Sequence, residues 1–357
     1  MIDKIKIICD LIRMKTVTSD VAAVNKATDY IHSILEKHGV YCQLEERNGR
    51  KILFASTQPG KTQDILFNAH IDVVPAPDKM FEPRMEGTIL HGRGSDDDLS
   101  SAACLIELLC NNRNCGGSLG CIFTTNEETG GTTTKYMIDK GYQGKRLAII
   151  LDGNTYSVEY GHKGVLVLRL TAESAGGHSS EPWNYQNPMD QLIDGYTALR
   201  KAWDHPTKED SWKPSLTATI FNAGEADNVI PQKASIVLNI RYTELDQKEK
   251  ILALVEEKTG IKPVVEFSGL PVLTDKDSPE IKLFFNAIQK YFPRENIFLD
   301  RGNGSTDARH MTGMGVPMII SGVVGGECHG DHEWSDTSKL DPLVHAIQEV
   351  IDEILKK

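Results

Sequence analysis

Two pairs of polar residues follow apolar runs in the first third of the sequence. His70 and Asp72 form an H-x-D pair after one run, and Glu127 and Glu128 stand together after another. A metal-binding histidine usually gives its second ring nitrogen to a carboxylate, which Asp72 can supply. Adjacent glutamates are costly to hold together unless a cation neutralises them. Metal binding by one glutamate and base catalysis by the other would explain the pair; a surface histidine and a solvated loop end are the alternatives.

Three further candidate ligands lie near strand ends or glycines. The turn 92-GRGSDDDLSSA-102 holds three Asp, any of which could supply a ligand, Asp152 follows the apolar run 146-RLAIIL-151, and His329 lies among glycines. Alone, the Asp cluster is better interpreted as a solvated helix N-terminus, where Asp is favoured. Zinc accepts imidazole and carboxylate ligands and keeps a position open for water in catalytic sites. Two metals roughly 3.5–4 Å apart can share one carboxylate, so the combined set predicts a binuclear site.

Other histidines and one cysteine are weaker candidates. Cys328 adjoins His329, but imidazole and carboxylate already suffice as ligands. His162, His310 and His332 are interpreted as ordinary polar loop residues.

The bulk composition limits the class of protein. A chain of 357 residues favours two domains, and 40% hydrophobic with 25% charged residues is typical of a soluble globular protein. The net charge of -11 argues against nucleic acid or an anionic membrane as partner. No apolar run approaches the roughly 20 residues that span a bilayer. Seven cysteines without CxxC pairs or a secretory leader predict reduced thiols in the cytoplasm.

The elements around the candidate site alternate between strand and helix. Such alternation predicts an α/β sheet covered by helices, with ligands at the carboxyl ends of the strands. The strand-length runs are 51–56, 64–70, 118–125 and 146–151, and the helical stretches are 20–38, 98–112 and 132–140.

The pattern changes after Gly161, where a second domain is expected. The order strand, helix, strand, strand, helix, strand is the split βαβ (ferredoxin-like) arrangement. We therefore predict an inserted domain over 163–272, and a first domain made of 1–162 and 273–357. The expected elements are strands 164–173, 216–222, 234–242 and 262–267 with helices 187–203 and 246–259, followed in the first domain by a helix over 278–290, a strand over 317–321 and a helix over 341–356.

The order of the motifs resembles that of one enzyme family. The chain carries H-x-D, G-R-G-x-x-D, E-E-x-G-G, a strand-end Asp and H-x-x-x-E in that order. This is similar to the di-zinc aminoacylase and carboxypeptidase G2-type metallopeptidases. That family includes acetylornithine deacetylase, succinyl-diaminopimelate desuccinylase, aminoacylases, carnosine-type dipeptidases and tripeptide aminopeptidase. The resemblance spans nearly the whole chain.

The resemblance implies two Zn²⁺ ions, for which Co²⁺ or Mn²⁺ can substitute. His70 and Asp152 would hold one ion, Glu128 and His329 the other, and Asp97 would bridge them.

The resemblance also implies the groups around the ions. Glu127 would be the general base, and Asp72 would orient His70. The peptide bond between Asp97 and Asp98 is expected to be cis, which is rare without proline.

The inserted domain resembles the family's lid and dimerisation domain, which implies a homodimer. His178 matches a lid histidine that stabilises the oxyanion, often from the partner subunit. Asn228, Arg241 and Arg309 lie in segments similar to those that grip a substrate carboxylate, a task suited to the planar fork of Arg. Alternatively, Arg241 is an exposed residue on an alternating strand.

The chain departs from the family pattern beside the bridging Asp. Many relatives have Lys and Gly where this chain has Leu99 and Ser100. Neither residue would bind metal, so activity is expected to survive.

The sequence predicts an enzyme that cleaves an amide bond of a dipeptide or short peptide with metal-activated water. Asp152 favours this substrate class, because Asp at that position accompanies aminopeptidases and dipeptidases in the family, whereas Glu accompanies deacylases and carboxypeptidases. The alternative is an N-acyl amino acid deacylase. A non-catalytic metal or amino-acid binding protein is a third interpretation, although such a relative should have lost a ligand or the base.

Overall fold

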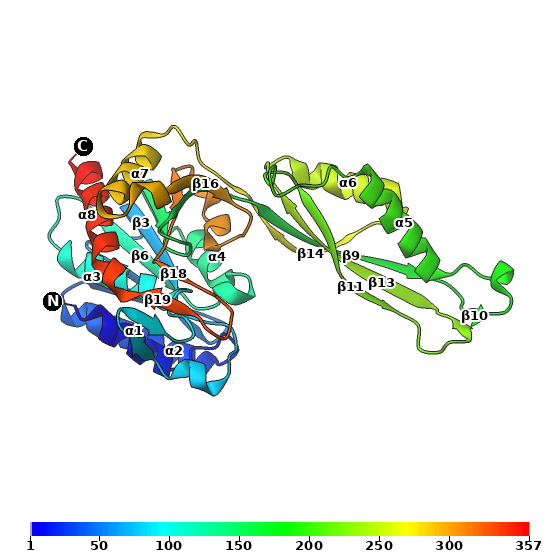
Figure 1. Cartoon of the computed structure of the whole chain (residues 1–357), viewed down its shortest axis with the longest axis horizontal. Coiled ribbons are helices and arrows are strands. Elements are labelled where there is room, and N and C mark those ends of the chain that lie inside the picture. Colours follow the sequence, from blue (N-terminus) through cyan, green and yellow to red (C-terminus); the bar gives the residue numbers. More distant parts are fainter. Residues whose placement is uncertain (1, 357) are drawn as a thin grey trace. The chain divides into compact units, whose positions relative to one another are not determined.

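The computed structural model describes residues 2–356 and divides into two compact units (Figure 1). Unit 1 consists of the residues up to Gly161, Leu273–Arg301 and those from Thr306 onward. Unit 2 consists of His162–Val272 and Gly302–Ser305. The short return segment 302–305 was not part of the insertion expected from the sequence.

Unit 1 is built on a nine-stranded mixed sheet. Its order is β1-β2-β6-β3-β7-β17-β8-β15, and β16 pairs with β8. Strands β6, β3, β7 and β17 run parallel to one another, so their carboxyl ends share one edge of the sheet. The strands are β1 (Tyr41–Arg47), β2 (Arg50–Ser56), β3 (Thr62–His70), β6 (Leu119–Thr124), β7 (Gln143–Ile150), β8 (Ser157–His162), β15 (Val272–Leu273), β16 (Phe298–Gly302) and β17 (Met318–Ile320).

Helices cover this sheet and enclose a large apolar core. Helix α3 is buried along nearly its whole length because it contacts β3, β6, α1 and α8. The start of α2 is fixed by the Asp20 carboxylate, which accepts a hydrogen bond from the Ala23 N–H at 3.0 Å. The helices of unit 1 are α1 (Lys4–Arg13), α2 (Val21–Lys37), α3 (Leu99–Asn111), α4 (Thr132–Asp139), α7 (Pro279–Tyr291) and α8 (Leu340–Leu355).

A small four-stranded sheet lies beside the main one, in the order β18-β19-β5-β4. Its strands are β4 (Arg84–Glu86), β5 (Ile89–His91), β18 (Gly325–Gly326) and β19 (Trp334–Asp336). The pairing of β5 with β19 joins segments that are far apart in the sequence. Strands of two or three residues carry no readable alternation, and none of these four was expected.

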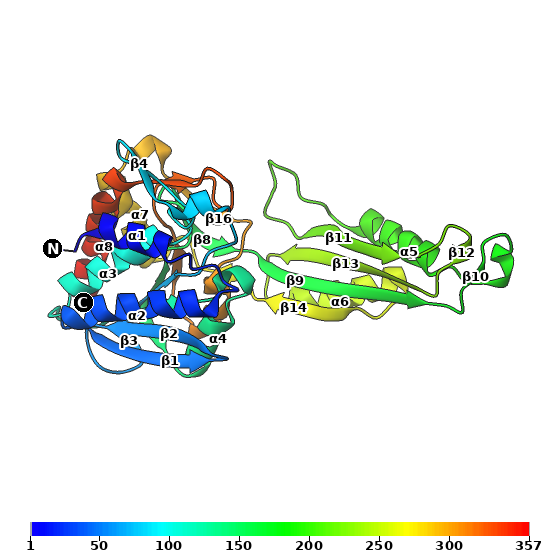
Figure 2. The same cartoon turned by 90° about the horizontal axis from the view of Figure 1, so that it is seen from below.

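Unit 2 has the predicted strand and helix order. Its antiparallel sheet has the order β11-β13-β9-β14, and α5 and α6 cover one face (Figure 2). Leu166, Leu168 and Leu170 point from β9 into the core under the helices. The elements are β9 (Gly164–Glu173), α5 (Pro188–Ala202), β11 (Ser215–Ala223), β13 (Lys233–Tyr242), α6 (Gln247–Thr259) and β14 (Val264–Gly269), with a short ladder of β10 (Gly177–His178) and β12 (Val229–Ile230).

Most elements expected from the sequence are present within about two residues of their expected bounds. The strand β1 was not expected. Its side chains are exposed or half-buried throughout, so it lacks the apolar alternation that identifies a strand. Within residues 2–356, no helix is both long and apolar enough to cross a membrane.

The separate core of unit 2 leads to a stability prediction. Leu168→Ala removes a fully buried side chain from β9 and should lower the free energy of unfolding by about 2–5 kcal/mol. Val264→Ala on the adjacent β14 is the control, because Val264 is 62% exposed and its loss should change stability by at most about 0.5 kcal/mol. Urea unfolding measures both. Equal losses for the two variants would contradict this packing.

Candidate metal centre

The ends of three parallel strands place the candidate ligands. His70 is the last residue of β3, Asp152 follows β7, and Glu127 and Glu128 occupy a 3-10 turn (Glu127–Thr129) after β6. Because β6, β3 and β7 are adjacent and parallel, these side chains meet at one edge. Two groups have ligand atoms within 4.8 Å of one another, namely His70 with Asp97 and Glu128, and His70 with Glu127 and Asp152.

Asp97 lies between two imidazoles. Its Oδ1 is 2.7 Å from His70 Nε2, and its Oδ2 is 3.1 Å from His329 Nε2. His329 Nε2 is also 3.1 Å from Glu128 Oε2, and His70 Nε2 is 4.0 Å from Asp152 Oδ1. The cluster therefore contains two pairs, His70 with Asp152 and His329 with Glu128, and each pair has one imidazole and one carboxylate. Asp97 contacts the imidazole of both pairs.

The chemistry of this donor set fits two metal ions. Imidazole nitrogen and carboxylate oxygen are ligands that zinc accepts. The buried Oε1 of Glu128 has no hydrogen-bond partner among the described residues, which is costly for a carboxylate oxygen unless a cation binds it. Shared carboxylates are a recurrent feature of two-metal sites. The residues present thus fit a binuclear centre.

The electrostatics of the two histidines reflect the carboxylates around them. Burial alone would lower the pKa of His70, but the hydrogen bond and charge of Asp97 outweigh it and raise that pKa well above its usual value. The hydrogen bonds with Asp97 and Glu128 raise the pKa of His329 to about 10. Burial acts to raise the pKa of Asp97, but the two imidazoles outweigh burial and lower that pKa.

Glu127 differs from the other carboxylates in its surroundings. Burial, followed by the charge of Asp307, raises the pKa of Glu127 to about 7, although His70 and Arg309 act to lower it. Arg309 Nη1 donates to Glu127 Oε1 at 3.0 Å. Burial also raises the pKa of Asp152 well above its usual value. A carboxyl group with a pKa near neutrality is well suited to take up and release a proton.

Asp72 contacts His70 through a different atom from the one expected. The Nδ1–H of His70 donates to the main-chain carbonyl of Asp72 at 2.8 Å, while the nearer carboxylate oxygen is 3.7 Å away. The carboxylate instead accepts hydrogen bonds from the Glu127 main-chain N–H at 3.1 Å and from Thr18 Oγ1 at 2.8 Å. Asp72 therefore links the loop that carries His70 to the loop that carries Glu127.

The peptide bond between Asp97 and Asp98 is cis, which confirms the prediction. Asp98 is buried, and its Oδ2 accepts a hydrogen bond from the main-chain N–H of His70 at 3.1 Å. This contact ties the end of β3 to the loop that carries Asp97.

The two departures from the family pattern are accommodated by packing. The Leu99 side chain is fully buried, and it lies so close to Gly94 that a Cβ there would be 2.7 Å from Leu99 Cδ1. Gly94 also has a φ of +83°, which disfavours any side chain. Ser100 Oγ donates to the Ser95 carbonyl at 2.6 Å and lies 3.2 Å from Ser335 Oγ.

Asp307 supports the site, although no role for it was predicted from the sequence. It is fully buried, and its Oδ2 accepts hydrogen bonds from Thr124 Oγ1 at 2.9 Å and from Thr134 Oγ1. A Cβ at Gly131 would come within 1.8 Å of its other oxygen, so only glycine fits beside it. Asp307 thus joins β6, α4 and the 3-10 turn (Asp307–His310) that carries Arg309. An Asp two residues before a candidate Arg was the available signal.

The predicted substrate residues are divided between the units. Arg309 lies in unit 1 and pairs with Glu127, whereas the other three lie in unit 2. His178 and Asn228 lie close together. His178 is the last residue of β10, and the N–H of the following residue, Ser179, donates to the Asn228 carbonyl at 3.0 Å. Arg241 is half-buried near the end of β13 that lies farthest from this ladder.

The weaker candidates lie outside both ligand groups found among residues 2–356. His162 is buried, His332 is exposed, and His310 Nε2 lies 3.0 Å from the Gly130 carbonyl. Burial raises the pKa of the Cys328 thiol to about 11, which disfavours the thiolate that binds metal.

Comparison with known proteins identifies related chains. Residues 66–353 match the profile of peptidase family M20/M25/M40. Succinyl-diaminopimelate desuccinylase 2 of Ruegeria sp. (strain TM1040) is 28% identical, over 96% of this chain and 92% of the relative. Probable succinyl-diaminopimelate desuccinylase of Staphylococcus aureus (strain MRSA252) is 22% identical, over 90% and 89%.

Solved structures show the same fold. Aminopeptidase PepT from Bacillus cereus ATCC 10987 aligns with a TM-score of 0.81 and 16% identity, over 99% of this chain and 98% of that chain. The M20 family metallo-carboxypeptidase Sso-CP2 from Sulfolobus solfataricus aligns with a TM-score of 0.78 and 15% identity, over 100% of both chains.

The raised pKa values of His70 and His329 predict coupled proton release. Their raised pKa values favour the protonated imidazoles when no metal is bound, whereas a metal requires them neutral. Metal binding should therefore release both imidazole protons, and metal affinity should fall as the pH is lowered from 8 to 6. Calorimetric titration in buffers of different ionisation enthalpy measures the protons released. A binding heat that is the same in every buffer would refute the prediction.

Proposed function

The chain belongs to peptidase family M20/M25/M40, and we propose that it is a di-zinc amidohydrolase that cleaves an amide bond of a dipeptide or short peptide. It is a metal-dependent hydrolase of this family. One observation carries the proposal of two ions: the two oxygens of Asp97 face two different imidazoles, those of His70 and His329.

In the proposed centre, His70 and Asp152 hold one ion, Glu128 and His329 hold the other, and Asp97 is shared. Co²⁺ or Mn²⁺ would fit the same donors. When bound, such ions lower the pKa of water and polarise the carbonyl group to be attacked.

Glu127 is the proposed general base. Its carboxylate takes a proton from the attacking water and delivers it to the leaving nitrogen of the amide. Arg309 holds Oε1, and Asp72 holds the main-chain N–H, so the residue is fixed at both ends. Since positioning governs the efficiency of proton transfer, these contacts support the assignment.

Substrate contacts are proposed for both units. The side chain of His178 would stabilise the oxyanion, and Asn228, Arg241 and Arg309 would bind the substrate carboxylate. Because Arg309 is already paired with Glu127, binding a carboxylate there would also reposition the base.

A homodimer formed through unit 2 is part of the proposal. Strand β11 is at the edge of its sheet, and Ile220 and Phe221 on it are 48% and 41% exposed. An edge strand with exposed apolar residues is a natural pairing surface. A cytoplasmic location is proposed too, which agrees with seven cysteines that are all free.

Asp152 favours a peptidase, as the family resemblance implies. The alternative is an N-acyl amino acid deacylase, which is favoured by the curated desuccinylase relatives. The chemistry is the same in both cases, because each breaks an amide bond. A non-catalytic binding protein is set aside, since the chain keeps the proposed base and all five proposed ligands and belongs to a hydrolase family.

The role of Glu127 predicts the effect of a conservative substitution. Glu127→Gln should reduce turnover by roughly 10²–10⁴-fold, because the amide cannot accept the proton, while two metal ions remain bound. Turnover and metal content by atomic spectroscopy are the measurements. Glu46→Gln, at an exposed site, is the control and should leave both unchanged. Loss of metal from Glu127→Gln would contradict the assigned role.

A substrate panel tests the proposed specificity. Enzyme loaded with zinc or cobalt would be mixed with dipeptides, tripeptides, and N-acetyl and N-succinyl amino acids, and released amines would be quantified. We expect cleavage of peptides with a free amino terminus. Cleavage of acyl amino acids alone would make the protein a deacylase and show that Asp152 does not mark peptidases.

A further inference from the structure

A buried ion pair lies directly behind the proposed metal centre. Arg93 Nη1 donates to Glu333 Oε2 at 2.5 Å, and the two side chains are 2% and 0% exposed. Arg93 Nη2 donates to the Gly330 carbonyl at 2.9 Å. The other carboxylate oxygen of Glu333 accepts the main-chain N–H groups of Asp96 at 3.0 Å and Asp97 at 3.1 Å.

The small sheet brings these two residues together. Strand β5 (Ile89–His91) pairs with β19 (Trp334–Asp336), with His91 opposite Trp334. The Gly92 N–H continues the ladder by donating to the Glu333 carbonyl at 3.2 Å. Strand β5 leads directly into the loop that carries Asp97, and the loop that carries His329 leads directly into β19.

The pair therefore controls two loops that carry proposed ligands. Arg93 precedes Asp97 by four residues, and Glu333 follows His329 by four residues. Glu333 binds the main chain of the Asp97 loop, and Arg93 binds the main chain of the His329 loop. Each residue is thus anchored in one loop and holds the other. Between these two loops, His329 Nε2 lies 3.1 Å from Asp97 Oδ2.

We propose that Arg93 and Glu333 are positioning residues that hold the Asp97 and His329 loops in the spacing required for binding the second metal ion. The inference rests on the metal centre of the proposed function. Among residues 2–356, the hydrogen bonds of this pair reach the proposed ligand loops only through main-chain groups. Arg93 binds the Gly330 carbonyl, and Glu333 binds the N–H groups of Asp96 and Asp97. Residues that orient metal ligands typically change affinity by about 10–100-fold when they are replaced.

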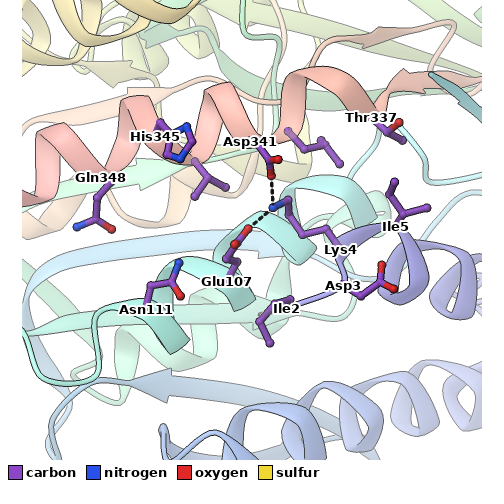
Figure 3. Close-up of a pocket in the computed structure, with 12 residues that line it drawn as sticks. Ile2, Asp3, Lys4, Ile5, Glu107, Asn111, Thr337, Asp341, His345 and Gln348 are labelled. Carbon is purple, nitrogen blue, oxygen red and sulfur yellow. Dashed lines mark hydrogen bonds and ion pairs between the residues drawn. The ribbon is translucent and has the colours of Figure 1, made fainter.

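The competing interpretation is an ion pair that only stabilises the fold. Breaking any buried pair leaves an uncompensated charge and destabilises a protein. A second buried pair in unit 1 provides the matched control, because Lys4 contacts Glu107 and Asp341 between α1, α3 and α8 (Figure 3). Lys4 and Glu107 are 8% and 13% exposed. Glu107 lies eight residues beyond Leu99, or about 12 Å along α3 from the end that adjoins Asp97.

The experiment compares Glu333→Gln with Glu107→Gln in the full chain. Zn²⁺ affinity at each site is measured by titration of the apo protein against a competing chelator, and apo stability is measured by thermal unfolding. We expect both variants to lower apo stability. Only Glu333→Gln should weaken one of the two Zn²⁺ sites, by about 10–100-fold, whereas Glu107→Gln should bind both ions as the wild type does.

Equal Zn²⁺ affinities for Glu333→Gln and the wild type would overturn the proposal. So would parallel losses of affinity in both variants, since these would follow stability rather than loop position. If Glu333→Gln does not fold, Arg93→Lys replaces it, because lysine keeps the charge but cannot bind the carboxylate and the Gly330 carbonyl as a planar fork. It should weaken the same site, and unchanged affinity would again reject the role. Zn²⁺ binding is measured without substrate, so the outcome is distinct from a failure of the hydrolase assignment.

Discussion

The crowding of carboxylates at one edge of the main sheet is the constraint on which the rest of this structure depends. Asp97, Glu127, Glu128 and Asp152 converge within a few ångströms, and all are at least partly buried. Bringing such charges together out of water is unfavourable unless cations compensate them. The imidazoles and Arg309 compensate only in part, because burial and then neighbouring carboxylates still raise the pKa values of Glu127 and Asp152. Divalent cations would complete the balance, and they explain why the fold brings the acids together.

The fold resists this repulsion by fixing main-chain positions around the ligands. Asp98 binds the N–H of His70, Asp72 binds the N–H of Glu127, and Glu333 binds the N–H of Asp97. In each case a buried carboxylate that is not a proposed ligand holds the backbone of a residue in the cluster. Such contacts restrict the loops more effectively than side-chain packing alone, because they fix where each side chain begins.

The sequence was sufficient to predict most strand ends and the polar side chains that stand there, because both depend on local pattern. A buried run followed by His or Glu is visible in residues 64–70 and 118–128. The supporting contacts depend on tertiary structure and were not predictable in this way. Glu333 meets Arg93 only because the three-residue strands β5 and β19, which are far apart in the sequence, pair with each other. Asp72 contacts His70 through its main-chain carbonyl, where a contact through its carboxylate was expected. Likewise, the pairing of Arg309 with Glu127 follows from the buried position of Asp307.

In the proposed function, the division of the chain into two units separates catalysis from substrate selection. Every proposed metal ligand and the proposed base lie in unit 1, whereas His178 and two of the three proposed substrate-binding residues lie in unit 2. An amide carbonyl presents the same reacting atoms in a peptide and in an acylated amino acid. The reacting atoms alone therefore give no basis for discrimination, and we propose that groups contacting the substrate's ends supply it. On this proposal, changes in unit 2 would alter the substrate while leaving the carboxylate cluster intact, so one catalytic arrangement would serve peptidases and desuccinylases alike.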